Sequence, residues 1–310
     1  MEFKHIPVLL NETIQGLNIK PNGIYVDGTI GGAGHSIKIL EQLSDKGLLI
    51  GIDRDEEALA VTKEKLKQYK NVKLVHGNHD NIREILDELN IEKVDGILMD
   101  LGVSSYQLDE KNRGFSYIGE DELDMRMDKT QEKTAKDVVN NYSESELEDI
   151  IKKYGEERFA KTIAKNICKQ RKISEITTTK QLVEIIEKSR PYSKDGHPAK
   201  RTFQAIRIEV NNEIKPLYDT VINSIESLNI GGRLCIITFH SLEDRAVKDA
   251  YVEAQGRCTC PKDLPYCICN YKSLGKIINK KPIQASKEEQ KENTRSKSAK
   301  LRIFERQNKE

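Results

Sequence analysis

The first hundred residues alternate short apolar runs with amphipathic stretches, and no other feature of the chain constrains its fold as strongly. This alternation is typical of βαβ units, in which helices join parallel strands and cover the sheet. We therefore predict an α/β fold with a mostly parallel sheet. The predicted strands are residues 24–27, 48–53, 72–76 and 96–100, and the predicted helices between them are residues 36–43, 56–69 and 82–89.

The middle third of the chain has a different pattern. It is charged and helix-rich and has no clear strand, which predicts an inserted helical domain. An amphipathic helix at 211–228, a glycine turn at 231–232 and an apolar strand at 233–239 then indicate that the sheet resumes. The predicted domains are a discontinuous sheet domain at 1–106 and 201–310 and an inserted helical substrate-recognition domain at 107–200.

Composition limits the class of protein. Hydrophobic residues make up 37% of the 310, enough for a sizeable core, and no apolar run approaches the roughly 20 residues that cross a bilayer. The start of the chain lacks the apolar stretch of a signal peptide, so we expect a cytoplasmic protein without a membrane partner. We expect its cysteines to be reduced and predict no metal. Zinc is the alternative for two CxC pairs, Cys258 with Cys260 and Cys267 with Cys269, whose spacing is tighter than that of the usual knuckle.

Basic residues are concentrated near the carboxyl terminus. The net charge of the chain is +1, but residues 271–310 contain twelve Lys or Arg against five Glu. Subtracting this +7 leaves −6 for the first 270 residues. We predict either a solvated, partly disordered tail or an arm that contacts phosphates. The candidate phosphate contacts are Lys200, Arg201, Arg207, Arg295, Lys297, Lys300 and Arg302.

A glycine-rich loop follows the first predicted strand. After Asp27 the chain reads GTIGGAGH and then enters a predicted helix. Glycines let the backbone pass close to a ligand, and ligands of open α/β sheets bind at the carboxyl ends of strands. Asp53 ends the next strand 26 residues after Asp27, where a carboxylate can accept hydrogen bonds from ribose hydroxyls. Loop and acid together predict a nucleoside cofactor.

The spacing of the glycines favours S-adenosylmethionine over a dinucleotide. It departs from the GxGxxG pattern, in which a pyrophosphate occupies the helix amino terminus. Two more predicted strand ends lead into the same crevice, with His79 after the third strand and Asp100 at the end of the fourth. A nicotinamide oxidoreductase would share the loop and Asp53, but it needs a hydride-relay residue and a domain for a small substrate, and the insertion offers only charged helices.

Long motifs along nearly the whole chain resemble the bacterial MraW (RsmH) methyltransferase family. They are HIPVLLNE at 5–12, the glycine loop, DRD at 53–55, DLGVSS at 100–105, RGFS at 113–116, LDMRMD at 123–128, YGEERFA at 154–160, HPAKRTFQA at 197–205, FHSLEDR at 239–245 and RSKSAKLR at 295–302. The sequence departs from the family at Glu122, where a proline is usual, and at His79, where many members have another aromatic residue.

The resemblance implies a Rossmann-like class I S-adenosylmethionine-dependent methyltransferase sheet with an inserted helical domain. It implies methyl transfer to N4 of a specific cytidine in the decoding region of small-subunit (16S) ribosomal RNA, either free or in the assembled small subunit. A non-catalytic ribosome-assembly factor that retains the fold is the alternative. The cofactor-binding residues that it implies are Ala33, Gly34, His35, Asp53, His79, Asp100 and Gln107.

Asp100 is the predicted catalytic residue. The cytosine amine is a poor nucleophile because its lone pair is delocalised into the ring, so an acceptor for the N4–H proton should accelerate the reaction. Amino-methyltransferases of DNA commonly have an Asp/Asn-Pro-Pro-Tyr motif after the fourth strand, and Asp100 occupies that place. Ser104 could assist it, Asp100 could instead cap the loop, and His240 is a second candidate. The candidate aromatic platforms for an extruded base are Phe115, Tyr117, Phe203 and Phe239.

Overall fold

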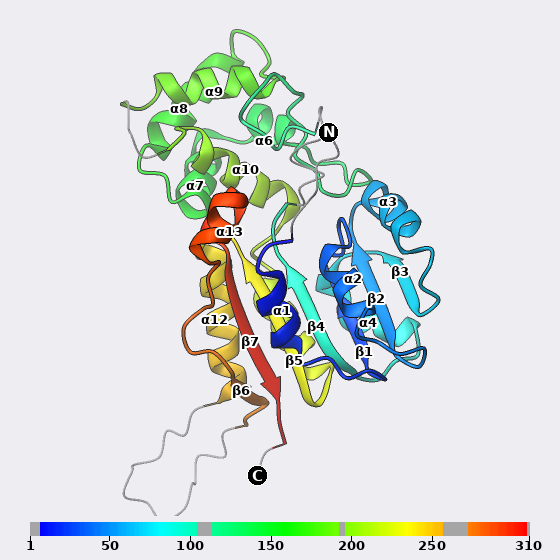
Figure 1. Ribbon diagram of the computed structural model, residues 1–310. Helices are drawn as coiled ribbons and strands as arrows, with labels where there is room; N and C mark the ends of the chain where they lie inside the picture. The colour runs from blue at the N-terminus through cyan, green and yellow to red at the C-terminus, as the bar shows by residue number, and fades with distance from the viewer. Residues whose placement is uncertain (1–6, 104–112, 192–195, 257–271, 309–310) are drawn as a thin grey trace, which may run out of the picture. The chain divides into compact units, whose positions relative to one another are not determined.

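The computed structural model describes residues 7–103, 113–191, 196–256 and 272–308 (Figure 1). Its contacts divide the chain into two compact units. We call Met1–Gly102 with Ile214–Glu310 the sheet unit, and Val103–Glu213 the helical unit.

In the described part of the sheet unit, seven strands form one sheet in the order β3-β2-β1-β4-β5-β7-β6. The strands from β3 to β5 are parallel, whereas β7 is antiparallel to both of its neighbours, β5 and β6. The predicted parallel α/β sheet is therefore confirmed. The strands are β1 (Ile24–Asp27), β2 (Leu48–Asp53), β3 (Val72–His76), β4 (Val94–Asp100), β5 (Leu228–Thr238), β6 (Gly275–Ile277) and β7 (Lys300–Arg306).

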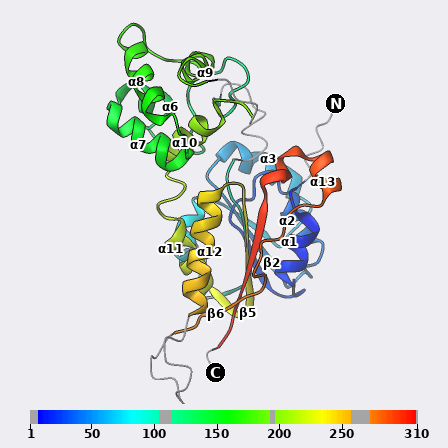
Figure 2. The same cartoon turned by 90° about the vertical axis from the view of Figure 1, so that its left-hand side faces the viewer.

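Helices cover both faces of this sheet (Figure 2). Successive strand side chains point to opposite faces, and Leu49 and Ile50 accordingly belong to different hydrophobic clusters. Because both clusters are buried, the central strands read as continuous apolar runs. One face packs against α1 (Leu10–Leu17), α2 (Gly34–Leu40) and α3 (Glu56–Leu66), and the other against α4 (Ile82–Glu88), α11 (Leu217–Glu226) and α12 (Ser241–Gln255).

The carboxyl-terminal segment lies within the sheet, which corrects the prediction of a polar tail. Strand β7 is hydrogen-bonded between β5 and β6, and its Leu301 and Phe304 side chains are fully buried. Arg302 Nε lies 2.6 Å from Asp244 Oδ1 on α12, and Lys300 Nζ lies 3.0 Å from Asp244 Oδ2. Lys300 and Arg302, predicted to contact phosphates, therefore form ion pairs inside the protein. Before β7 come a short helix, α13 (Lys287–Glu292), and a 3-10 helix, η2 (Thr294–Ser298).

Two further boundaries differ from the predicted ones. The helix predicted at 211–228 is α11, which begins at Leu217, after Pro216. The glycine pair predicted to form a turn lies inside β5, where Gly231 has a φ of 80° and the register against β4 shifts between Val94 and Gly96. Glycine tolerates this left-handed backbone, so the strand continues through it.

The helical unit has its own apolar core. In it α7 packs against α8 and α10, and α8 packs against α9. Capping boxes begin α6, α7 and α9, through Thr134, Ser143 and Thr178. The helices are α6 (Ala135–Asn141), α7 (Glu144–Gly155), α8 (Ala160–Arg171), α9 (Thr179–Lys188) and α10 (Lys200–Asn211).

The helical unit is longer than the predicted insertion at 107–200. Its carboxyl-terminal helix α10 was placed with the sheet domain, but α10 packs against α6 and α7, and the unit extends to Glu213. In the described parts of both units, no helix is long and apolar enough to cross a membrane.

Asp244→Ala is expected to lower the free energy of unfolding by about 2 kcal/mol, because it leaves the buried Arg302 guanidinium without its carboxylate. Burial opposes ionisation of Asp244, but hydrogen bonds from Arg302 and Lys300 outweigh it and keep the pKa of Asp244 below its ordinary value. The loss should therefore be complete above about pH 4 and shrink at lower pH.

Urea unfolding at several pH values measures this difference. The control is Glu41→Ala, which removes an exposed ion pair with Lys38 and should cost less than about 1 kcal/mol. Equal losses in the two variants would contradict the structural role of Asp244.

Candidate functional site

Three neighbouring parallel strands end in an aspartate: Asp27 on β1, Asp53 on β2 and Asp100 on β4. Asp27 is buried, and its carboxylate accepts hydrogen bonds from Ser36 Oγ at 2.7 Å and Thr29 N at 3.2 Å. Burial raises the pKa of Asp27 to about 6, against the effect of these two bonds. One edge of the sheet thus gathers carboxyl groups that are costly to ionise.

The Asp53 carboxylate holds the glycine loop against β2. Its Oδ2 accepts from Gly31 N at 2.8 Å and its Oδ1 from Asp55 N at 2.9 Å, while Ile30 N donates to Ile52 O at 3.0 Å. Burial raises the pKa of Asp53, and the two amide hydrogen bonds partly offset that rise. The same side chain that was predicted to bind a ribose therefore also shapes the loop beside it.

At the end of the glycine loop, Gly34 and His35 lie against the amino-terminal segment. Ala33 has a left-handed φ of 63° and precedes α2. A Cβ atom on Gly34 would lie 2.2 Å from Cγ of Pro7, so this close approach requires glycine. His35 is buried, with Nε2 3.0 Å from Val8 O and Nδ1 3.9 Å from Asp100 Oδ2.

His79 lies in the short 3-10 helix η1 (His79–Asn81) that follows β3. Its side chain is buried, and its Cβ is 3.1 Å from where a Cβ on Gly28 would be, so it borders the start of the loop. Burial and the nearby Arg54 charge lower the pKa of His79 to about 4, against the attraction of Asp80. Its ring is therefore neutral at neutral pH.

Asp100 has an oxygen without a partner. Its backbone N donates to Thr29 Oγ1 at 2.6 Å, but the buried Oδ1 accepts no hydrogen bond from any residue that the structure describes. Burial, reinforced by the charges of Asp27 and Glu243, raises the pKa of Asp100 to about 8. A buried acceptor that lacks a donor is costly in a folded protein and often marks a functional site.

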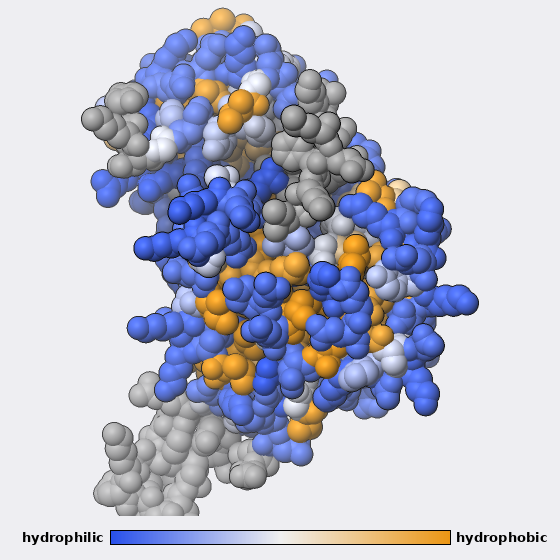
Figure 3. All heavy atoms as spheres, in the orientation of Figure 1, coloured by the Kyte–Doolittle hydropathy of each residue, from blue (hydrophilic) through white to orange (hydrophobic). Residues whose placement is uncertain are grey.

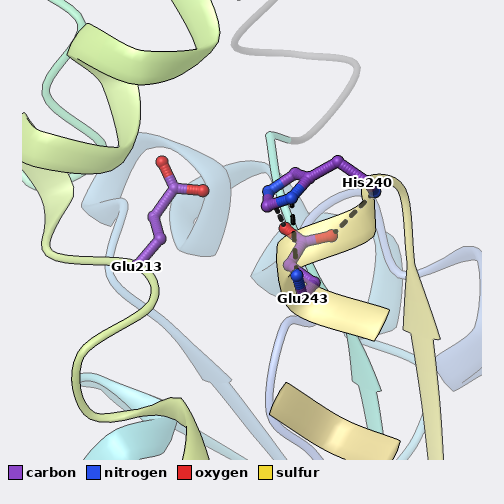
Figure 4. A group of neighbouring side chains, drawn as sticks. All are labelled: Glu213, His240 and Glu243. Atoms are coloured by element: carbon purple, nitrogen blue, oxygen red, sulfur yellow. Dashed lines mark hydrogen bonds and ion pairs between the residues drawn. The ribbon is translucent and has the colours of Figure 1, made fainter. Parts of the chain in front are cut away.

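Glu243 is a site residue that the sequence prediction missed. It is buried at the amino terminus of α12, where its Oε2 accepts from Phe239 N at 2.7 Å and from His240 N at 3.3 Å. His240 Nε2 lies 2.9 Å from Glu243 Oε1 (Figure 4). This capping box fixes the turn after β5, and the side chain of His240 takes part in it. The sequence did not reveal this capping box because the cap is a histidine, whereas Ser, Thr, Asp or Asn is usual at this position.

Most of the other candidates have partners inside their own unit. In the helical unit Arg207 pairs with Glu213, also drawn in Figure 4, at 2.8 Å, and Arg201 Nη1 donates to Glu156 O at 2.9 Å. Lys200 is exposed. Phe115 and Phe203 are buried, Tyr117 stacks on His197 with ring centroids 4.5 Å apart, and Phe239 of the sheet unit is half-buried. Gln107, Ser104, Cys258, Cys260, Cys267 and Cys269 lie outside the described residues.

Comparison with known proteins adds an independent finding. The family model described as the MraW methylase family matches residues 2–307. A protein of Clostridium botulinum (strain 657 / Type Ba4), named Ribosomal RNA small subunit methyltransferase H, is 57% identical over 98% of this chain and 99% of its own length. A protein of the same name from Lachnospira eligens is 57% identical, with 99% of this chain and 98% of the relative covered.

Asp100→Asn is expected to stabilise the protein at high pH. Folding raises the pKa of Asp100 to about 8, so its contribution to stability is complete below the unfolded value near pH 4 and is lost as the pH rises to about 8. Asparagine does not ionise. The unfolding free energy of the variant minus that of the wild type should therefore increase by at least about 1 kcal/mol between pH 5 and pH 8.

Thermal unfolding at pH 5, 6.5, 8 and 9 measures this difference. The control Asp45→Asn changes an aspartate that is exposed in the turn after α2, and its difference from the wild type should stay flat. A flat profile for Asp100→Asn as well would show that the folded protein does not disfavour the carboxylate.

Proposed function

The chain belongs to the MraW methylase family, and from this premise we propose that it transfers a methyl group from S-adenosylmethionine to N4 of a cytidine in small-subunit (16S) ribosomal RNA. The observation that carries the proposal is the match with relatives named as small-subunit rRNA methyltransferases over nearly the full length of both chains. We further propose the decoding region as the target, and free RNA or the assembled subunit in the cytoplasm as the substrate.

The residues at the carboxyl edge of the sheet are chemically suited to S-adenosylmethionine. Each Asp53 oxygen that accepts an amide hydrogen bond has a further lone pair for a ribose hydroxyl. The neutral His79 ring can pack against adenine without the cost of burying a charge. The cofactor-binding residues in the proposal are Ala33, Gly34, His35, Asp53, His79, Asp100 and Gln107.

The bound cofactor supplies a methyl group on a sulfonium, whose leaving group is neutral, so the protein mainly has to position the reactants. The amine nitrogen forms a bond to carbon and must lose a proton. We assign that proton to the unpartnered Oδ1 of Asp100, which accepts it in the ionised state. Glu243 is a positioning residue in this scheme because it fixes the turn after β5. The helical unit is proposed to recognise the substrate.

Methyl transfer from radiolabelled cofactor to transcribed 16S rRNA, free and assembled with small-subunit proteins, tests the function. We expect one methyl group per RNA, located on N4 of a cytidine by nuclease digestion and mass spectrometry. Absence of transfer to both substrates would favour a non-catalytic assembly factor, and a label on another atom would reject the N4 assignment.

Asp100→Asn is expected to slow single-turnover methyl transfer at saturating cofactor by about 100-fold or more, because the amide cannot take the proton. The wild-type rate should rise with pH and level off above about pH 8, as the carboxylate ionises. Because Asp100 is also a proposed cofactor contact, cofactor affinity is measured for the variant as well, so that both proteins are compared at saturation. An unchanged rate constant in the variant would remove Asp100 from the reaction.

Asp53→Ala is expected to weaken binding of S-adenosylhomocysteine by about 10- to 100-fold, because both the charged acceptor and the support of Gly31 are lost. Isothermal titration calorimetry measures the affinity. The matched control is Asp45→Ala, at an exposed position away from the loop. If both variants bind like the wild type, Asp53 is not a cofactor residue.

A further inference from the structure

A basic hollow lies on the sheet unit at α13 and η2. Its volume is about 370 Å³, and Lys287, Gln290, Lys291, Thr294 and Lys297 line it. We call this surface the lysine hollow. Lys287 and Lys291 are four residues apart on α13, so their side chains project from the same side of the helix. Hydrophilic side chains gather over this helix in Figure 3.

The three lysines of the hollow are exposed, and their ammonium groups lack a partner among the residues that the structure describes. The same helix contains three carboxylates. Glu289 Oε1 accepts a hydrogen bond from Leu9 N at 2.8 Å, whereas Glu288 and Glu292 are exposed and do not line the hollow. Lys300 differs, because it is paired with Asp244. The basic tail thus separates into charges used within the protein and charges that face outward.

The backbone that carries these lysines is fixed at several points. Ser286 caps α13 by accepting from Glu289 N at 3.1 Å, and Gln290 Nε2 donates to Ala285 O at 2.9 Å. Asn293 Oδ1 accepts from Arg295 N at 3.1 Å at the start of η2. Because these hydrogen bonds fix the backbone before a ligand binds, less conformational entropy is lost when three ammonium groups surround one ligand.

The hollow lies close to the edge of the sheet where the cofactor loop lies. Lys300, two residues after η2, pairs in register with Thr238 at the carboxyl end of β5. In addition, Leu9 N binds α13 while its neighbour Val8 accepts from His35 at 3.0 Å. A single short segment therefore connects the lysine hollow to the glycine loop.

We propose that the lysine hollow binds backbone phosphates of the RNA substrate close to the methylated cytidine, an inference that rests on the proposed function. Lysine ammonium groups around an open hollow suit phosphate oxygens, which recur along any strand. The lining has no aromatic ring on which a base could stack. Contacts of this kind position the strand and do not read its sequence.

The test is a triple variant, Lys287→Gln with Lys291→Gln and Lys297→Gln, in the full-length protein. Binding to transcribed 16S rRNA is measured by filter retention between 50 and 300 mM salt. We expect roughly tenfold weaker binding near 100 mM salt, and a slope of log affinity against log salt that is smaller in magnitude by roughly 2. S-adenosylhomocysteine affinity should not change, which controls for folding.

The matched control removes the same charge elsewhere, by Lys46→Gln with Lys70→Gln and Lys73→Gln, at exposed positions near the amino-terminal ends of β2 and β3. A slope equal to that of the wild type in the first triple variant, or an equal drop in the control, would overturn the proposal. Methyl transfer by the wild-type protein is scored separately. If the wild type methylates the RNA and the slope is unaffected, the hollow proposal fails while the function stands.

Discussion

Aspartates at the ends of parallel strands are the constraint on which the site depends. A carboxylate taken out of water must be satisfied by donors, and two of the three accept hydrogen bonds from the glycine loop or the residues next to it. Asp27 binds Ser36 and Thr29, and Asp53 binds Gly31 and Asp55. The loop geometry follows from these bonds. At Asp100, no described residue donates a hydrogen bond to Oδ1. This oxygen is therefore available to accept a proton from a substrate.

The hydrophobic pattern of the sequence predicted the strands of the parallel sheet, where the burial of each residue matches its hydrophobicity. The strands ending at Asp27, Asp53 and Asp100 were predicted to within two residues because both faces of the sheet are buried, which produces continuous apolar runs. Their convergence at one edge followed from the parallel arrangement. Contacts between residues distant in sequence were not predictable in this way. The glycine at 34 is required by Pro7, and nothing in the loop itself announces that contact.

The carboxyl-terminal strand shows why charge counting was misleading. Residues 271–310 contain twelve Lys or Arg against five Glu, and this excess of positive charge suggested a solvated tail. In the structure Arg302 pairs with an aspartate on α12, Asp244, more than fifty residues earlier in the chain. The burial of Arg302 depends on that pairing. Sequence can count the charges, but tertiary structure decides which of them face inward. The exposed lysines of this segment include Lys272, Lys276, Lys280 and Lys281 as well as the three of the lysine hollow.

The short segment from Pro7 to Leu9 has a consequence for how the protein is made. It touches Gly34 and His35 at one end and Glu289 at the other, so an amino-terminal segment and the late helix α13 meet beside the loop. During synthesis these contacts cannot close until α13 has left the ribosome. Strand β7, which separates β5 from β6, comes later still. A chain truncated before α13 would contain every residue of the glycine loop but would lack the hydrogen bond between Leu9 and Glu289. We therefore expect such a chain to bind the cofactor more weakly than the full-length protein.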